Sequence, residues 1–275
     1  MNAREAAAQI APRLAAAGVA DPGFEAEYLV RVAANISRTG YFRGHEMCDK
    51  AQARLEAVVG RRLKREPAAY IHGEREFYGL AFEVSPDVLL PRPETELLVE
   101  LGLRECHRLS QPLILDVGTG SGAVAVAIAH GTGAGAVRVA GTDLSAKALA
   151  VAVRNALRLG VEVQFVRGDL LAPIGHADIV LANLPYIPSA VIAVLEPEVR
   201  DWEPRLALDG GEDGLDLVRR LVDDCAARIH PKLLAMEVGR GQAATVADYC
   251  TRHGARTEIV PDLAGIARVV CARWA

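Results

Sequence analysis

From about residue 93 to its end, the sequence alternates apolar strand-like runs with helix-like stretches. Repeated alternation of this kind is typical of a parallel sheet that carries helices on both faces. Helices are expected to end near His130 and Leu159, between four runs rich in branched residues, which are 112–118, 137–144, 161–170 and 177–183. The chain is therefore predicted to be an α/β protein.

The second half of this region continues the pattern and then changes it. A helix is expected from about Leu215, followed by a strand over 232–239 and a helix over 242–254. The last two runs, 257–263 and 267–274, follow each other without a helix between them. Such a pair predicts an antiparallel hairpin in the sheet.

The first 65 residues differ from the rest because they are rich in helix formers. Breaks at Gly18, 21–23 and 38–44 predict three helices in a small domain. Apolar residues spaced four apart predict one buried stripe on each helix. The stripes are Ile10 with Leu14, Tyr28 with Val32, and Leu55 with Val59.

Two short runs follow this helical region. The runs 76–85 and 88–91 are rich in aromatic and branched residues and are interrupted at Gly79. This pattern predicts a β-hairpin between the two larger regions.

Composition limits what such a chain can do. Of its 275 residues, 51% are hydrophobic and 24% are charged, which suits a globular protein with a sizeable core. The formal net charge of −4 gives no overall positive field to attract nucleic acid. Five widely spaced cysteines without a C-x-x-C pair favour a reduced protein. Without a membrane span or a signal-peptide core, a cytoplasmic protein is expected.

A glycine-rich loop follows the run 112–118. Glycines at alternate positions let the backbone turn tightly and approach a ligand closely. A dinucleotide site has the spacing G-x-G-x-x-G, but here the third glycine comes one residue early and Asp116 precedes the first. A carboxylate repels a pyrophosphate but suits the ammonium group of S-adenosylmethionine. The expected contacts of this cofactor are Asp116, Gly118, Thr119, Gly120, Ser121 and Gly122.

Acidic residues also end the next two strand runs. Asp143 lies about 20 residues after the glycine loop, where an acidic side chain accepts hydrogen bonds from ribose hydroxyls. It is also a candidate helix N-cap, although Ser145 is available for that task. Asp169 and Leu170 are expected beside the adenine of the same cofactor.

The turn Asn-Leu-Pro-Tyr, at 183–186, ends the fourth run at the same edge of the sheet. Asn and Pro are common turn formers, so a purely structural turn is one interpretation. The other is catalytic, because methylating a planar NH₂ group needs two hydrogen-bond acceptors and a flat surface. The Asn183 side-chain oxygen and the Leu184 carbonyl provide the acceptors, and the Tyr186 ring provides the surface. Pro185 holds Leu184 extended, and no metal is required.

These motifs, taken in order, resemble those of methyltransferases that modify planar NH₂ groups. Residues 65–100 and 203–217 narrow the resemblance to the HemK-type protein-(glutamine-N5) methyltransferases, which modify peptide chain release factors. The similarity covers roughly 62–275. It implies a seven-stranded, Rossmann-like methyltransferase domain that uses S-adenosylmethionine and follows a small helical domain and a β-hairpin linker.

The resemblance also implies a division of labour along the chain. Residues 1–73 would recognise the substrate, 74–92 would be the linker and 93–275 would be the catalytic domain. The implied acceptor is the side-chain amide nitrogen of a glutamine in the Gly-Gly-Gln loop of a release factor, and no membrane is involved. The motif Arg-Pro-Glu-Thr-Glu, at 92–96, is a helix start, and in the family it also lies near the active site.

One departure leaves other acceptors open. Leu184 stands where the family usually has proline, and the resulting turn also resembles that of the ribosomal RNA adenine dimethyltransferases. An adenine amino group is therefore an alternative acceptor, although the acidic balance disfavours nucleic acid. A small metabolite with an amide or amine is another. A non-catalytic scaffold that binds the cofactor is disfavoured by the intact Asn-x-Pro-Tyr turn.

Overall fold

The structure, a computed structural model, describes residues 1–133, 135 and 137–274 and divides the chain into two compact units. Unit 1 consists of Met1–Glu74 together with Glu196–Trp202, and unit 2 consists of Arg75–Leu195 together with Glu203–Ala275. None of the helices within the described ranges is long and apolar enough to cross a membrane.

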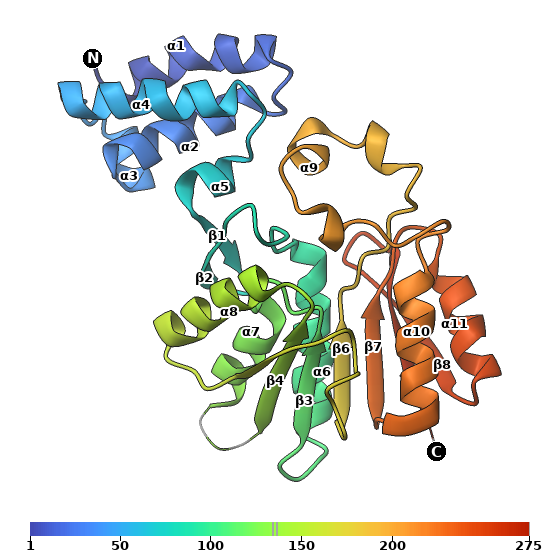
Figure 1. The fold of residues 1–275 in the computed structure, drawn as a ribbon. Coiled ribbons are helices and arrows are strands. Elements are labelled where there is room, and N and C mark those ends of the chain that lie inside the picture. The colour runs from blue at the N-terminus through green and yellow to red at the C-terminus, as the bar shows by residue number, and fades with distance from the viewer. Residues whose placement is uncertain (134, 136, 275) are drawn as a thin grey trace. The chain divides into compact units, whose positions relative to one another are not determined.

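Unit 1 is built of helices around its own apolar core (Figure 1). Asn2 begins the first helix with a capping box, in which its side chain accepts from the Glu5 N–H while the Glu5 carboxylate accepts from the Asn2 N–H. Pro22 starts the second helix, at a position where an N–H is not needed. The helices are α1 (Ala3–Ala16), α2 (Pro22–Ala34), α3 (Arg38–Phe42), α4 (Asp49–Arg62), α5 (Ala68–His72) and α9 (Pro197–Arg200).

Two of the three predicted apolar stripes, those of α1 and α4, are buried as expected. The third, Tyr28 with Val32 on α2, is wrong, because both side chains are partly exposed. The Tyr28 hydroxyl is instead hydrogen-bonded to Nδ1 of His72 at 2.9 Å. Since α2 has apolar residues on more than one face, a spacing of four did not identify the buried one. That face consists of Ala26, Leu29, Val30 and Ala33.

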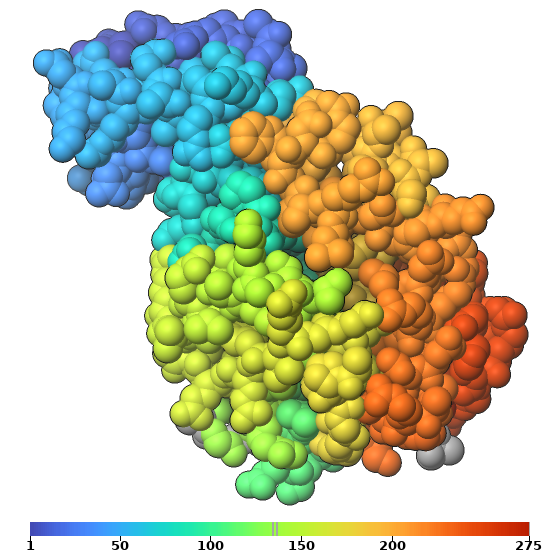
Figure 2. Space-filling model, in the orientation of Figure 1, coloured from blue at the N-terminus to red at the C-terminus, as the bar shows by residue number. Residues whose placement is uncertain are grey.

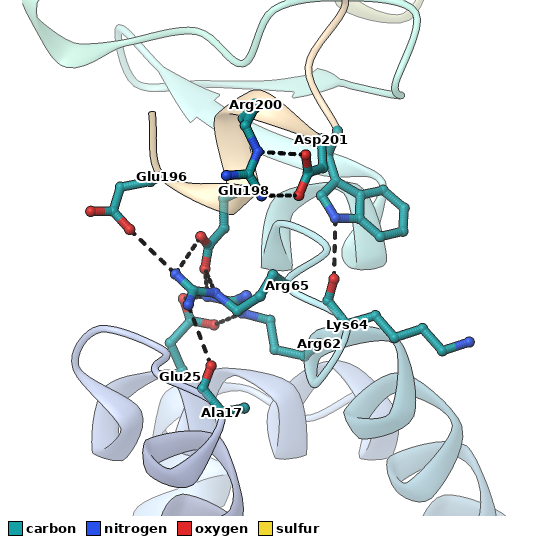
Figure 3. A network of polar contacts seen from close by, with 10 residues as sticks. Ala17, Glu25, Arg62, Lys64, Arg65, Glu196, Glu198, Arg200 and Asp201 are labelled. Atoms are coloured by element: carbon teal, nitrogen blue, oxygen red, sulfur yellow. Dashed lines mark hydrogen bonds and ion pairs between the residues drawn. The ribbon is translucent and has the colours of Figure 1, made fainter. Parts of the chain in front are cut away.

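Buried ion pairs hold the segment 196–202 within unit 1 (Figure 3). The Arg62 guanidinium, which is only 3% exposed, donates to Glu25 at 3.1 Å and to Glu198 at 2.9 Å. Arg65 donates to both carboxylate oxygens of Glu198, at 2.7 and 2.6 Å. Burial raises the pKa of Glu198, but the hydrogen bonds from Arg65 and Arg62 outweigh this and keep it below its usual value.

Unit 2 contains a seven-stranded sheet in the order β5-β4-β3-β6-β7-β9-β8 (Figure 1). The strands from β5 to β7 are parallel, and β9 is antiparallel to both β7 and β8. The predicted α/β sheet and its terminal antiparallel hairpin are therefore confirmed. The strands are β3 (Leu113–Val117), β4 (Arg138–Asp143), β5 (Gln164–Arg167), β6 (Ile179–Ala182), β7 (Leu233–Glu237), β8 (Arg256–Pro261) and β9 (Ala267–Arg273).

Helices cover both faces of this sheet and form two apolar cores. One core includes residues of α6, α7 and α8, and the other includes residues of α10 and α11. In Figure 2 the yellow segment after β5 lies against the orange surface of α10, where Arg220 pairs with Asp169. The elements are η1 (Pro93–Thr95), α6 (Glu96–Cys106), α7 (Ala123–Thr132), α8 (Ala146–Leu159), η2 (Ile192–Val194), η3 (Arg205–Ala207), α10 (Asp216–Asp224), the π-helical turn η4 (Cys225–Ile229) and α11 (Ala243–Arg252).

The predicted β-hairpin is present, but it is shorter than expected. Strands β1 (Glu74–Phe77) and β2 (Leu80–Glu83) pair with each other. Tyr78 and Gly79 join them with φ angles of 51° and 71°, as a two-residue hairpin turn requires. The run 88–91 is not a strand, because prolines at 86 and 91 remove backbone donors on both sides of it. Its apolar character reflects burial instead, since Val88 and Leu90 lie in the interior.

Candidate functional site

The sheet order brings the predicted site residues to one edge. Strands β4, β3 and β6 are neighbours and parallel, so the glycine loop, Asp143 and Asn183 all follow carboxyl ends that lie side by side. A cavity of about 220 Å³ opens at this edge, where ligands of α/β proteins collect. Of the predicted residues, its lining includes Gly118, Gly120, Asp143, Asp169, Leu170, Asn183, Leu184 and Pro185.

The glycine loop is held against β4 by its own backbone. The N–H groups of Gly118 and Thr119 donate to the Thr142 carbonyl at 2.8 and 2.9 Å. Gly118 has a φ of 72°, which favours glycine, and a Cβ there would lie 3.0 Å from Cδ2 of Leu184. The loop therefore leaves no space for a side chain between the glycine backbone and the Asn-Leu-Pro-Tyr turn.

Asp116 lies beneath the glycine loop and is 3% exposed. Its Oδ2 accepts hydrogen bonds from the Thr119 hydroxyl at 2.6 Å and from the Ala125 N–H at 3.3 Å. Burial raises the pKa of Asp116 to about 6, because desolvation disfavours the charged form. Asp116, Thr119, Ser121 and Gly122 are not among the residues that line the cavity, and the bond from Thr119 ties the loop to Asp116.

Asp143 faces both the loop and the cavity. Its Oδ2 accepts from the Gly120 N–H at 2.9 Å, and its Oδ1 accepts from the Ser145 N–H at 2.8 Å. Ser145 is the N-cap of α8, with its hydroxyl accepting from the Ala148 N–H. Burial raises the pKa of Asp143. Since a carboxylate oxygen accepts more than one hydrogen bond, both oxygens retain capacity for a ligand's hydroxyl groups.

Asp169 and Leu170 form another part of the cavity wall. Leu170 has a φ of 48°, in the left-handed region that residues other than Gly, Asn and Asp rarely adopt. Its carbonyl accepts from the Thr142 hydroxyl at 3.2 Å, which ties this strained residue to the end of β4. Asp169 is about half exposed and pairs with Arg220, which also lines the cavity.

Asn183 and Tyr186 meet two residues that the sequence did not single out for a role. The Asn183 Nδ2 donates to the Thr95 hydroxyl at 3.0 Å, and that hydroxyl donates to Oε2 of Glu237 at 2.6 Å. The Tyr186 hydroxyl donates to Oε1 of Glu237 at 3.4 Å. Burial, together with the charge of Glu237, raises the pKa of Tyr186 to about 12.

A glycine-rich segment, residues 210–214, supports the backbone of this turn. The Ile187 N–H donates to the Leu208 carbonyl at 3.1 Å, and the Gly210 N–H donates to the Ile187 carbonyl at 2.9 Å. A Cβ on Gly210 would lie 2.6 Å from the Pro185 carbonyl oxygen, and one on Gly214 would overlap the Tyr186 carbonyl oxygen. The turn and its support are therefore in backbone contact.

The sequence contained partial signals for the missed residues. Thr95 lies in the motif at 92–96, and Glu237 lies within the predicted strand 232–239 and ends the observed strand β7, next to β6 in the sheet. Six further residues line the cavity although the sequence assigned them no role there: Asp87, Val88, Leu89, Pro204, Leu206 and Ala207. Within the described ranges, no group of three or more His, Cys, Asp or Glu side chains is arranged to hold a metal ion.

This sheet, with its cavity at the ends of β3, β4 and β6, defines a seven-stranded methyltransferase of Rossmann-like fold. A solved structure of a T. thermophilus 16S rRNA N2 G1207 methyltransferase, in complex with AdoMet and guanosine, has the same fold with a TM-score of 0.52. It is 15% identical, and the match covers 74% of this chain and 50% of that one. Residues 114–200 also match the family model described as "Methyltransferase domain".

Comparison of sequences identifies the family more specifically than the fold does. Residues 5–73 match the family model described as "PrmC N-terminal domain". A release factor glutamine methyltransferase from Deinococcus radiodurans is 39% identical over 279 residues, covering 100% of this chain and 99% of the relative. Another, from Moorella thermoacetica, is 40% identical over 274 residues, covering 96% of each.

The chain belongs to the release factor glutamine methyltransferase family. Its members are S-adenosylmethionine-dependent enzymes, so the predicted family, fold class, enzyme class and cofactor are confirmed.

Proposed function

We propose that the protein transfers a methyl group from S-adenosylmethionine to the side-chain amide nitrogen of a glutamine in the Gly-Gly-Gln loop of a peptide chain release factor. The names of relatives that match the chain end to end support this acceptor. The observation that carries the proposal is the Asn-Leu-Pro-Tyr turn, which lies at the cavity edge beside the glycine loop. Glycines before the acceptor glutamine add no side-chain bulk, which suits entry into a narrow site.

We further propose how the cavity binds the cofactor. The backbone of Gly118 and Gly120 lies close to the methionine portion, and Asp143 accepts from the ribose hydroxyls. Asp169 and Leu170 lie beside the adenine. Asp116, Thr119, Ser121 and Gly122 act by holding the loop, as their place beneath the cavity supports.

The proposed catalytic turn works by orientation. S-adenosylmethionine supplies an electrophilic methyl group on a sulfonium. An amide nitrogen is a poor nucleophile because its lone pair is delocalised, so the enzyme gains most by fixing that nitrogen in line with the methyl group. Asn183 and the Leu184 carbonyl accept from the two N–H groups of the acceptor, and the Tyr186 ring lies against its plane. Pro185 keeps Leu184 extended.

The parts of the chain are proposed to have different roles. Residues 1–73 recognise the release factor, residues 74–92 link the two larger regions, and residues 93–275 catalyse methyl transfer. Release factors act at the ribosome, so the proposed place of action is the cytoplasm.

The test is mass spectrometry of purified release factor after incubation with enzyme and cofactor. One added methyl group on the Gly-Gly-Gln glutamine is expected. With Asn183→Ala, we expect transfer to fall about 10²–10³-fold, because loss of one aligned hydrogen-bond partner typically costs this much. Parallel reactions contain ribosomal RNA and cell extract with labelled cofactor. If the release factor stays unmodified while RNA or a metabolite is labelled, the labelled molecule is the acceptor instead. Undiminished transfer by Asn183→Ala would refute the orientation mechanism.

A further inference from the structure

The side-chain amide of Asn183 has two orientations, and only one is useful to an acceptor that presents N–H groups. Rotating the amide by half a turn exchanges its oxygen, an acceptor, for its NH₂ group, a donor. Since the two orientations have nearly the same shape, only neighbouring hydrogen-bond partners distinguish them. The contacts of Asn183 therefore determine whether the cavity receives an acceptor or a donor.

Thr95 is the residue that meets this amide. It is the N-cap of α6, but its hydroxyl makes no capping bond to that helix, which is the usual task of a threonine there. The side chain is buried, with the residue 5% exposed. Its hydroxyl lies 3.0 Å from Asn183 Nδ2 and 2.6 Å from Oε2 of Glu237.

A hydroxyl has one hydrogen, and Glu237 determines where it goes. Both oxygens of Glu237 accept, one from the Thr95 hydroxyl and the other from the Tyr186 hydroxyl, so the Thr95 hydrogen points to Glu237. The Thr95 oxygen then has only lone pairs to offer Asn183, which must present its NH₂ group. With the opposite orientation, two oxygens would face each other without a hydrogen between them. Asn183 Oδ1 is thus the amide atom left for the cavity that Asn183 lines.

Glu237 contacts the turn from the neighbouring strand. It ends β7, is 2% exposed and lies next to the end of β6, from which Asn183 follows. Burying a carboxylate is costly unless it is hydrogen-bonded. Its two oxygens accept from Thr95 and from Tyr186, so a single buried group contacts both functional sides of the turn.

We propose that Thr95 and Glu237 are positioning residues, which form a one-directional hydrogen-bond chain that fixes the Asn183 amide with its oxygen toward the methyl acceptor. The inference deepens the proposed function and rests on it for the identity of the acceptor. Neither residue touches the acceptor, and each acts through Asn183.

A double-mutant cycle in the full-length protein tests the chain. Thr95→Val keeps the shape but removes the hydroxyl, and Glu237→Met removes the carboxylate. Each is expected to lower kcat for release factor about 10–100-fold, while the dissociation constant of S-adenosylmethionine changes less than about threefold. The double variant is expected to be no slower than the slower single variant. Losses that multiply in the double variant would overturn the proposal.

Two further comparisons distinguish the proposed role from a simple folding defect. Thr95→Ser keeps the hydroxyl, so it is expected to restore kcat to within about threefold of the parent. Thr95→Val leaves Glu237 buried without its short hydrogen bond, whereas the double variant removes that charge and should recover thermal stability. If kcat recovers together with stability in the double variant, the role of Thr95 is structural and the proposal fails.

A readout without substrate separates this inference from the proposed function. The NMR signals of the Asn183 side-chain NH₂ group are assigned by their absence in Asn183→Ala. They are expected to shift in Thr95→Val and in Glu237→Met, and to stay near their place in Thr95→Ser. Unshifted signals in Thr95→Val overturn the hydrogen-bond chain, even where release factor is methylated normally. Shifted signals with an unmodified release factor would instead refute only the acceptor.

Discussion

At the level of single residues, the Asp143 side chain is proposed to have two roles in the site. It organises the glycine loop through the Gly120 N–H and retains acceptor capacity for a ribose. We predict that Asp143→Ala weakens the binding of S-adenosylmethionine by about tenfold or more, because two hydrogen bonds to a partly buried carboxylate are worth more than about 1.4 kcal/mol. Calorimetric titration measures this directly. Asp248→Ala, a change at an exposed aspartate of the same unit, is the control. Unchanged affinity in Asp143→Ala would leave this residue a purely structural role.

Leu184 is the residue at which the chain departs from the usual turn of its family, and its surroundings explain why leucine fits. The side chain is 4% exposed, belongs to the core beneath the sheet edge, and packs over Gly118. Burying a whole leucine side chain contributes about 1.5–3 kcal/mol, whereas a proline at a compatible position stabilises by about 0.4–1 kcal/mol. Packing therefore outweighs pre-organisation here.

We accordingly predict that Leu184→Pro lowers the free energy of unfolding by about 1 kcal/mol, because proline retains only part of the buried carbon surface. Its kcat should stay within about threefold of the parent, because the carbonyl at this position is kept. Urea unfolding and steady-state kinetics measure the two quantities. A more stable Leu184→Pro protein would mean that the leucine packing contributes little.

At the level of elements, the glycine-rich segment that follows η3 is as much a part of the site as the turn itself. Gly214 has a φ of 80°, and a Cβ there would overlap the Tyr186 carbonyl oxygen. We predict that Gly214→Ala lowers the free energy of unfolding by about 2 kcal/mol or more and lowers kcat as well, because the turn must move away.

Gly265→Ala is the matched control for this change. Gly265 has a similar φ of 75°, but no atom lies within 4 Å of its added Cβ. It should show only the backbone cost of about 1 kcal/mol and a normal kcat. If the two alanine variants behave alike, contact with Tyr186 is not what requires glycine at 214.

The elements of unit 2 were predictable from sequence because each is encoded locally. Buried parallel strands are continuous apolar runs, and the helices between them begin and end at residues such as Ser145 and Gly160. The run 88–91 misled because apolar residues also fill a core without pairing. Burial alone does not specify a strand.

Long-range contacts were not predictable in the same way. Glu198 joins Arg62 across 136 residues, and Thr95 joins Glu237 across 142. Neither pair has a local pattern, since a glutamate in a short helix and a threonine before a helix have ordinary roles on a surface or as a cap. The proposed cofactor residues could be suggested from sequence because a loop and a strand end constrain them locally. The hydrogen bonds that orient them required the folded chain.

At the scale of the whole molecule, both units contain acidic groups whose pKa values the fold shifts. In unit 2, burial raises the pKa of Asp116 to about 6 and also raises the pKa values of Glu203 and Glu237. In unit 1, two arginines keep the pKa of Glu198 lowered against the effect of burial. A carboxyl group with a raised pKa stabilises the fold below its unfolded pKa, and this contribution is lost as pH rises through the folded pKa. A group with a lowered pKa behaves in the opposite way.

Between pH 7 and pH 5, we expect stability to change through carboxyl groups with raised pKa values and not through Glu198. The folded state takes up a proton at Asp116 in this range, while the unfolded chain, in which this group has its ordinary pKa of 3.8, does not. We predict that Asp116 by itself makes unit 2 more stable at pH 5 than at pH 7 by about 1 kcal/mol, so that Asp116→Asn lowers this pH 5 advantage by the same amount. Glu198 contributes no change in this range, because its stabilisation is lost only as pH falls below its ordinary pKa of 4.5, through its lowered pKa.

The two tryptophans of the chain allow each unit to be followed separately. The indole of Trp202 donates to the Lys64 carbonyl in unit 1, and that of Trp274 donates to the His253 carbonyl in unit 2. Single-tryptophan proteins, made with Trp202→Phe or Trp274→Phe, are unfolded in urea at pH 5 and pH 7, each with and without Asp116→Asn. The loss of stability on going from pH 5 to pH 7, followed by Trp274, should be about 1 kcal/mol smaller in the proteins that carry Asp116→Asn. The stability followed by Trp202 should not respond to this substitution. If the loss of stability is as large with Asp116→Asn as without it, the raised pKa of Asp116 is contradicted. If the stability followed by Trp202 responds to this substitution, both units unfold as one.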